Sequence, residues 1–118
     1  MESSDLQSLK DRLRRFAEDR DWDKFHSPKN LAMALIVEAG ELVEHFQWLT
    51  EDQSKRISKD ELDKIEQELA DILLYLVRLA DKLDISLYDA VNKKISMNQT
   101  RYPAEQVRGS SKKYTEYR

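Results

Sequence analysis

The sequence predicts an all-α protein, a bundle of four helices, in one domain over residues 1–118. Glycine and proline, which interrupt helices, occur only twice each among 118 residues. Alanine, leucine, glutamate and lysine, which favour helices, are frequent. Apolar residues also recur every three or four positions in four segments, and each segment follows a serine that is suited to cap a helix.

The first two helices are expected from their starting residues. The segment Ser4–Gln7 has the form of a capping box, so we expect a helix from about residue 5 to residue 20. The apolar pattern then breaks for several residues. Ser27 as N-cap, followed by a proline at the first helical position, predicts a second helix from residue 28 to residue 47 or 48.

Two further helices are expected after a polar connection over residues 50–59. A second capping box opens the third helix, whose apolar stripe continues to about residue 83. Ser86 predicts the start of the fourth helix, which should continue to about residue 99, before a Tyr-Pro pair stops it. The tail over residues 104–118 shows no periodicity, so we expect it to be mobile or to lie across a neighbouring subunit.

Composition excludes several classes of function. The net charge is −3, from 20 basic and 23 acidic side chains mixed along the chain, which disfavours binding to a nucleic acid polymer. No cysteine is present, so thiolate chemistry and disulfides are excluded. No apolar run approaches the roughly 20 residues of a membrane span, and the N-terminus has no apolar signal core. We expect a cytoplasmic protein that does not bind membranes.

The second helix is apolar on two sides. Met33 and Val37 point away from the stripe formed by Leu31, Leu35 and Leu42. A single small bundle offers little to cover this second strip. We therefore expect at least a dimer.

Two carboxylate pairs, Glu38-x-x-Glu41 and Glu68-x-x-Asp71, lie inside segments that otherwise read as buried helix. A carboxylate that leaves water without a partner costs several kcal/mol, so it must be paired with a cation, protonated or bound to a metal ion. Residues three apart lie near one face of a helix. If the second and third helices pack side by side, the four carboxylates converge.

A cluster of carboxylates without histidine or cysteine favours a hard cation, Mg²⁺ or alternatively Mn²⁺, over zinc. Magnesium in turn suggests a phosphate substrate. The alternative is that these residues form ordinary salt bridges on helix surfaces, because Glu-x-x-Glu is common in acidic helical proteins. A di-iron bundle would need Glu-x-x-His pairs on facing helices, and the two pairs contain no histidine.

The two pairs have the form and order of the signature of the all-α nucleoside triphosphate pyrophosphohydrolases of the MazG-like superfamily, which this chain resembles. The likeness is strongest to the dCTP pyrophosphatases of animals and covers nearly the whole chain. It is carried by Arg20-Asp21-Trp22, Phe25-His26, Pro28-x-Asn30-Leu31, Gly40-Glu41-Leu42, Phe46-Gln47-Trp48, Asp71-Ile72-Leu73-x-Tyr75-Leu76, Lys94-x-x-x-Asn98-x-x-Arg101-Tyr102-Pro103 and Ser111-x-Lys113-Tyr114-Thr115-Glu116.

The resemblance implies Mg²⁺-dependent hydrolysis of dCTP, or of modified deoxycytidine triphosphates, to the monophosphate and pyrophosphate. It also implies that the protein clears such nucleotides from the pool and assembles as a homo-oligomer, with a tetramer favoured. The four acidic residues would be the catalytic metal ligands, and one of them would also orient the attacking water. They are Glu38, Glu41, Glu68 and Asp71.

Substrate-binding residues are also implied by the resemblance. Trp22 and Trp48 would line the base pocket, and Asn98 would contact the nucleotide. Lys94 and Arg101 would face the phosphates. Further candidates for stacking on the base are Tyr75 and Tyr102, for which core packing is the alternative role.

One departure from the resemblance leaves the base preference open. The animal enzymes often carry a histidine nine residues before the tryptophan that matches Trp22, and this chain has Leu13 there. A site that lacks a hydrogen-bonding group discriminates less between bases. His26 and His45 are interpreted as structural or surface residues. Two alternatives therefore remain: the same reaction on dUTP or noncanonical nucleotides, or a non-catalytic helical oligomerisation module.

Overall fold

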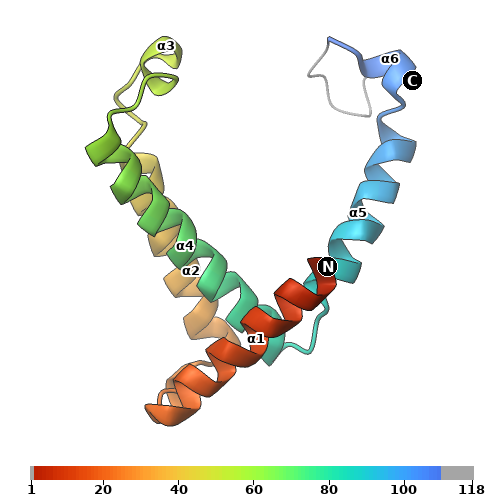
Figure 1. Ribbon diagram of the computed structural model, residues 1–118. Coiled ribbons are helices and arrows are strands. Elements are labelled where there is room, and N and C mark those ends of the chain that lie inside the picture. Colours follow the sequence, from red (N-terminus) through yellow and green to blue (C-terminus); the bar gives the residue numbers. More distant parts are fainter. Residues whose placement is uncertain (1, 110–118) are drawn as a thin grey trace. The chain divides into compact units, whose positions relative to one another are not determined.

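The computed structural model describes residues 2–109, and side chains from residue 5 onward. This part of the chain contains helices and no strand, which confirms the all-α class (Figure 1). The elements are α1 (Glu2–Asp19), the short 3-10 helix η1 (Asp23–Phe25), α2 (Pro28–Glu44), α3 (Glu51–Ser54), α4 (Lys59–Lys82), α5 (Leu87–Arg101) and α6 (Ala104–Val107).

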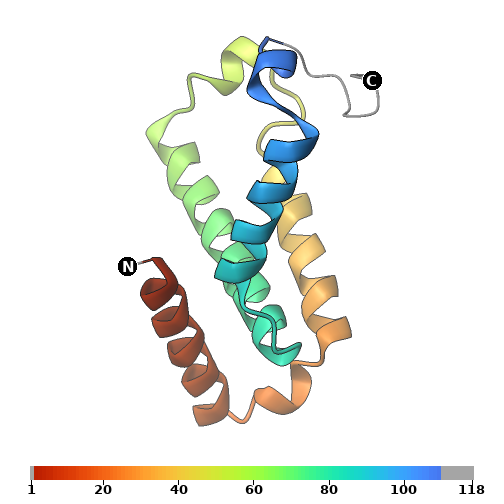
Figure 2. The ribbon, with the colours of Figure 1, turned by 90° about the vertical axis from the view of Figure 1, so that its right-hand side faces the viewer.

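The chain divides into two compact units. The first ends at Ile85 and contains α1 to α4, and the second begins at Ser86 and contains α5 and α6. In the first unit α2 and α4 run antiparallel and side by side, and α1 packs against α4 (Figure 2). The four-helix bundle and the single domain stay predictions, because each unit is described by itself.

Serine caps start three of the long helices at the predicted positions. The hydroxyl of Ser27 accepts a hydrogen bond from the Asn30 N–H over 3.1 Å, and Pro28 occupies the first turn of α2. Equivalent bonds of 3.3 Å reach Ser58 at the start of α4 and Ser86 at the start of α5. Each bond satisfies one amide that the helix itself leaves without a partner.

Several predicted boundaries are wrong. Helix α1 begins at Glu2, so Ser4 lies inside the first turn and is not its N-cap, and the helix ends at Asp19. Helix α2 ends at Glu44, because the following amides bond to carbonyls three residues back, as His45 does to Leu42 over 3.2 Å. Such bonds tighten the last turn and stop the α-helix. Helix α5 reaches Arg101, two residues beyond the predicted end.

Short helices occupy two segments that were predicted to be irregular. Helix α3 lies in the expected connection because Thr50 and Gln53 form a reciprocal capping box, with bonds of 3.1 Å and 2.9 Å. Helix α6 lies at the start of the expected tail. The predicted mobility of the tail, and its predicted place across a neighbouring subunit, concern mainly residues 110–118, which lie outside the described residues.

The core of the described chain is small. Five apolar side chains are buried, and they belong to α1, α2 and α4: Ala17, Leu31, Ile65, Val77 and Ala80. The predicted second strip on α2 is largely exposed, with 56% of Met33 and 57% of Val37 accessible. None of the described helices combines the length and the apolar character that crossing a membrane requires.

Candidate active site

An acidic cluster lies between α2 and α4. It consists of Glu38 and Glu41 on α2 and Glu68 on α4, and one carboxyl oxygen from each lies within 4.8 Å of the others. Glu38 and Glu68 are half-buried and Glu41 is exposed. The cluster forms because Glu38 and Glu41 are three residues apart on a helix that packs directly against α4.

Two features show that the carboxylates of the acidic cluster are poorly compensated by the described residues. Glu68 Oε2 is buried and has no hydrogen-bond partner among the described residues. Burial, with the neighbouring carboxylates of Glu68 and Glu41, raises the pKa of Glu38 to about 7. Ionised carboxylates only accept hydrogen bonds, so the three groups cannot satisfy one another without a proton or a cation.

The donor set fits a hard divalent cation. One carboxylate oxygen from each of Glu38, Glu41 and Glu68 could hold such an ion, because Mg²⁺ binds carboxylate oxygens in proteins. Such an ion would satisfy the unpaired oxygen of Glu68. It would also offset the repulsion from the neighbouring carboxylates that, together with burial, raises the pKa of Glu38.

Asp71, the fourth predicted ligand, is not among the three grouped oxygens. Its charge contributes to the raised pKa of Glu38, so it lies near the cluster. Asp71 also lines a cavity of about 210 Å³, which we call the aromatic cavity. The residues around this cavity are Leu13, Phe16, Ala17, Trp22, His26, Asp71, Leu74, Tyr75 and Arg78.

Trp22 is held at the aromatic cavity by the way α1 ends. Asp21 adopts a positive φ of 55°, which reverses the chain. The Trp22 N–H then donates to the Ala17 carbonyl over 2.9 Å, and the Asp21 N–H donates to Glu18 over 3.1 Å. The indole meets the Phe16 ring edge to face at a centroid distance of 5.8 Å.

Arg78 supports the loop that carries Trp22 and His26. Its side chain is buried, and it donates to Asp23 over 2.8 Å, to Asp81 over 3.2 Å and to His26 over 3.3 Å. We did not predict this residue from the sequence. A signal was available, because Arg78 continues the helical line of Glu68, Asp71 and Tyr75 as a cation within an apolar run.

The comparisons with known proteins place this chain in a family. The model of the MazG-like family matches residues 33–117. This chain belongs to the MazG-like family. The match begins before Glu38 and extends beyond α6, so it includes all four predicted metal ligands.

Curated relatives of this MazG-like chain carry informative names. It is 47% identical over 103 residues to dCTP pyrophosphatase 1 of Homo sapiens and 45% identical to that of Mus musculus. Both matches include 86% of this chain and 61% of the relative. The chain thus spans about three fifths of the length of these relatives.

A solved structure shares the fold of this MazG-like chain. It is a pyrophosphatase from Archaeoglobus fulgidus, with a TM-score of 0.78 and 38% sequence identity. The superposition covers 83% of this chain and 92% of the archaeal chain. The agreement therefore extends over most of both molecules.

Of the remaining predicted site residues of this MazG-like chain, one lies in the first unit and four lie in the second unit, which is described by itself. Trp48 follows α2, is 85% exposed and does not line the cavity. Lys94, Asn98 and Arg101 lie on α5 in the second unit, at spacings that place them along one side of the helix. Tyr102 follows them, and its N–H donates to the Asn98 carbonyl over 2.8 Å.

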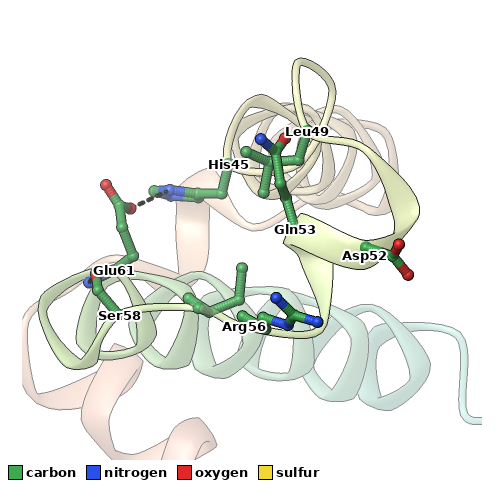
Figure 3. A pocket seen from close by; sticks show the side chains of 8 residues that line it. His45, Leu49, Asp52, Gln53, Arg56, Ser58 and Glu61 are labelled. Atoms are coloured by element: carbon green, nitrogen blue, oxygen red, sulfur yellow. Dashed lines mark hydrogen bonds and ion pairs between the residues drawn. The ribbon is translucent and has the colours of Figure 1, made fainter.

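A second cavity lies where α2, α3 and the start of α4 meet (Figure 3). Its volume is about 420 Å³, and His45 and Glu61 face each other at its edge, with Nδ1 and Oε2 3.2 Å apart. This pair gives His45 a structural contact, as we expected. None of the predicted catalytic or substrate-binding residues lines this cavity.

Proposed function

We propose that this MazG-like protein hydrolyses dCTP, or modified deoxycytidine triphosphates, to the monophosphate and pyrophosphate with Mg²⁺ as cofactor. The observation that carries the proposal is the acidic cluster with its unpaired Glu68 oxygen, close to an aromatic cavity. The names of the human and mouse relatives support the choice of dCTP. The proposal includes a cytoplasmic location and a role in clearing unwanted nucleotides.

The acidic side chains have defined roles in this proposal. Glu38, Glu41, Glu68 and Asp71 would hold Mg²⁺, which when bound neutralises charge on the phosphate oxygens. One carboxylate of the set also orients the attacking water and accepts its proton. The exposure of Glu41 leaves the cluster open to an incoming triphosphate.

The base is proposed to bind in the aromatic cavity. Trp22 and Tyr75 offer aromatic faces there, and stacking on one base contributes about 1–3 kcal/mol. In the same proposal, Trp48 and Tyr102 add aromatic contacts to the nucleotide. Lys94 and Arg101 contact the phosphates, and Asn98 contacts the nucleotide.

The test is product analysis on a panel of nucleoside triphosphates with Mg²⁺. We expect dCTP to give dCMP and pyrophosphate, and Glu68→Gln to lower kcat/KM by at least about a hundredfold. Glu66→Gln is the matched control, because Glu66 is exposed on the same helix and lies outside the cluster. Release of dCDP and phosphate would reject the reaction.

Base preference is tested separately by the same panel. Equal rates on every base would reject the assignment to cytosine and favour the broader substrate set. This outcome would leave the reaction class intact. Leu13 in the wall of the aromatic cavity is the feature that motivates this alternative, because it offers no hydrogen bond to a base edge.

We also propose that the protein forms a homo-oligomer, with a tetramer favoured. The exposed apolar strip on α2 supports this, since Ile36 is 68% exposed beside Met33 and Val37. Sedimentation should show a smaller assembly for Ile36→Glu than for the wild type. Ser8→Glu adds the same charge on α1 and should leave the assembly unchanged. A monomeric wild type would reject this proposal.

A non-catalytic oligomerisation module is the competing function. The same apolar strip favours it. It predicts that Glu68→Gln leaves the protein as stable or more stable and that Mg²⁺ changes nothing. Loss of turnover in a variant that retains its fold would decide for the enzyme.

A further inference from the structure

Two side chains of opposite charge border the second cavity, which lies where α2, α3 and the start of α4 meet. Asp52 belongs to α3, and Arg56 lies in the connection that follows this helix. No described residue forms a hydrogen bond or an ion pair with either side chain. The carboxylate of Asp52 therefore keeps its full capacity to accept hydrogen bonds, and the guanidinium of Arg56 keeps all its donors.

The way α3 ends explains why Asp52 and Arg56 do not pair with each other. Along a continuous α-helix, an aspartate and an arginine four residues apart lie side by side and commonly form an ion pair. Helix α3 ends at Ser54, however, and the next two amides bond to carbonyls three residues back. These bonds join Lys55 to Asp52 over 3.2 Å and Arg56 to Gln53 over 3.0 Å. The tighter turn carries Arg56 away from the side of the helix on which Asp52 lies.

The other ionisable groups around the second cavity have partners. Glu61 Oε2 lies 3.2 Å from His45 Nδ1, and because an ionised carboxylate only accepts hydrogen bonds, this nitrogen is the donor. Lys64 Nζ lies 3.8 Å from the other carboxylate oxygen of Glu61. Figure 3 shows the pair of His45 and Glu61 well apart from Asp52 and Arg56. Among the residues that line this cavity, Asp52 and Arg56 are thus the two charges that remain unpaired.

The second cavity also has an apolar wall and the size of a small-molecule site. Leu49 and Ile57 line it; Leu49 is 37% exposed and Ile57 is half-buried. The volume of about 420 Å³ lies within the range of roughly 300–1,000 Å³ that is usual for such sites. The cavity therefore offers an anionic acceptor, a cationic donor and apolar surface to one small molecule.

The charges disfavour several classes of ligand. A phosphate or a dicarboxylate would bring a second negative charge close to Asp52. A metal ion would be repelled by Arg56. A neutral apolar molecule would leave both side chains without a partner. The ligand that matches both charges is a zwitterion.

We propose that the second cavity binds a free α-amino acid with an apolar side chain. Arg56 binds its carboxylate, for which the planar guanidinium can supply two parallel hydrogen bonds. Asp52 accepts from its ammonium group, and its side chain packs against Leu49 and Ile57. None of the residues of the acidic cluster or of the aromatic cavity lines this site, so the inference does not depend on the proposed function.

The probe is L-leucine, titrated into ¹⁵N-labelled protein and followed by the NMR signals of the backbone amides around the cavity. We expect saturable shifts with a dissociation constant of about 1 mM or below. Leucinamide lacks the carboxylate, 4-methylpentanoate lacks the ammonium group and glycine lacks the apolar side chain. Each should bind at least about threefold more weakly than leucine. This panel uses the wild type alone, so it decides the inference even if a variant fails to fold.

Two variants assign the contacts. Arg56→Gln and Asp52→Asn each remove one charge and keep most of the side chain, and each should weaken leucine binding about three- to tenfold. Glu51→Gln is the matched control for Asp52, because both are acidic residues of the first turn of α3. Lys55→Gln is the control for Arg56, because Lys55 is exposed and does not line the cavity. Both controls should bind leucine within about twofold of the wild type.

Three results would overturn the inference. Equal affinity for leucine, leucinamide and 4-methylpentanoate would show that the protein recognises neither charge. Unchanged binding in both Arg56→Gln and Asp52→Asn would place leucine at another site. The absence of saturable shifts up to about 20 mM leucine would show that the cavity binds no such ligand, whatever the activity on dCTP.

Discussion

Arg78 Nη2 donates to Asp23 Oδ1 over 2.8 Å, and this bond connects the C-terminal part of α4 to η1. The carboxylate accepts a second bond of 2.6 Å from Lys82. These two charge-assisted hydrogen bonds lower the pKa of Asp23, with Lys82 the larger cause. The bonds from Arg78 and Lys82 to Asp23 hold the loop that carries Trp22 and His26 against α4.

Arg78→Met should destabilise the fold by about 3 kcal/mol, because it leaves the nearly buried carboxylate of Asp81 with one cation fewer. Urea denaturation measures the change. Lys82→Met is the control, because Lys82 is only half-buried and Asp23 would keep Arg78. An Arg78 variant that is no less stable than the Lys82 variant would show that the network contributes nothing specific.

Glu38 should make the stability of metal-free protein depend on pH. Its pKa is raised from the ordinary 4.5 to about 7 on folding, so between these values the folded chain binds more protons than the unfolded chain. The free energy of unfolding should therefore fall as pH rises from about 4.5 to about 7, and this loss should level off above pH 7.

The matched variant for this pH effect is Glu38→Gln, measured in EDTA. The difference between wild type and variant isolates Glu38, because His26 and the other titrating groups are present in both. Saturating Mg²⁺ should abolish the difference in slope. Parallel curves in EDTA would show that Glu38 does not titrate differently in the folded state.

Trp22→Ala should raise KM for dCTP by a factor between about five and about 150, which corresponds to the loss of one stacking contact. Trp22→Phe should retain most of the affinity because it keeps an aromatic face. Phe25→Ala is the control, since Phe25 is 59% exposed and does not line the aromatic cavity. Equal KM values for Trp22→Ala and the control would reject the proposal that the base binds in the aromatic cavity.

Asp21→Gly should stabilise the protein by up to about 1 kcal/mol. Asp21 has a φ of 55°, a conformation that glycine adopts without steric cost. The ion pair with Lys24 that the substitution removes is exposed and contributes little. Asp84, which follows the end of α4, has the same φ of 55°. Asp84→Gly should therefore change the melting temperature in the same direction. Lower melting temperatures for both variants would contradict this reading of the two turns.

The fold could be predicted where local signals are strong. Ser27, Ser58 and Ser86 cap their helices because a hydroxyl can satisfy a free amide without help from the rest of the chain. The short helices α3 and α6 were missed because four residues are too few to show an apolar period.

The acidic cluster was accessible from sequence for a different reason. Glu38 and Glu68 lie in apolar runs, where an unpaired charge is costly, so the position of each predicts a charged or metal partner. The same argument predicts a charged partner for Arg78, which also lies in an apolar run. Its partner Asp23 lies 55 residues away along the chain, in a loop without periodicity, so only the packing of η1 against α4 reveals the pair.

Binding of Mn²⁺, followed by electron paramagnetic resonance on the nucleotide-free protein, reports on the cation site without depending on turnover. We predict saturable binding by the wild type that weakens at least about tenfold in Glu68→Gln and is retained in Glu66→Gln. Equal binding by the wild type and Glu68→Gln would mean that the buried oxygen of Glu68 holds no cation, and the acidic cluster would lose its proposed role.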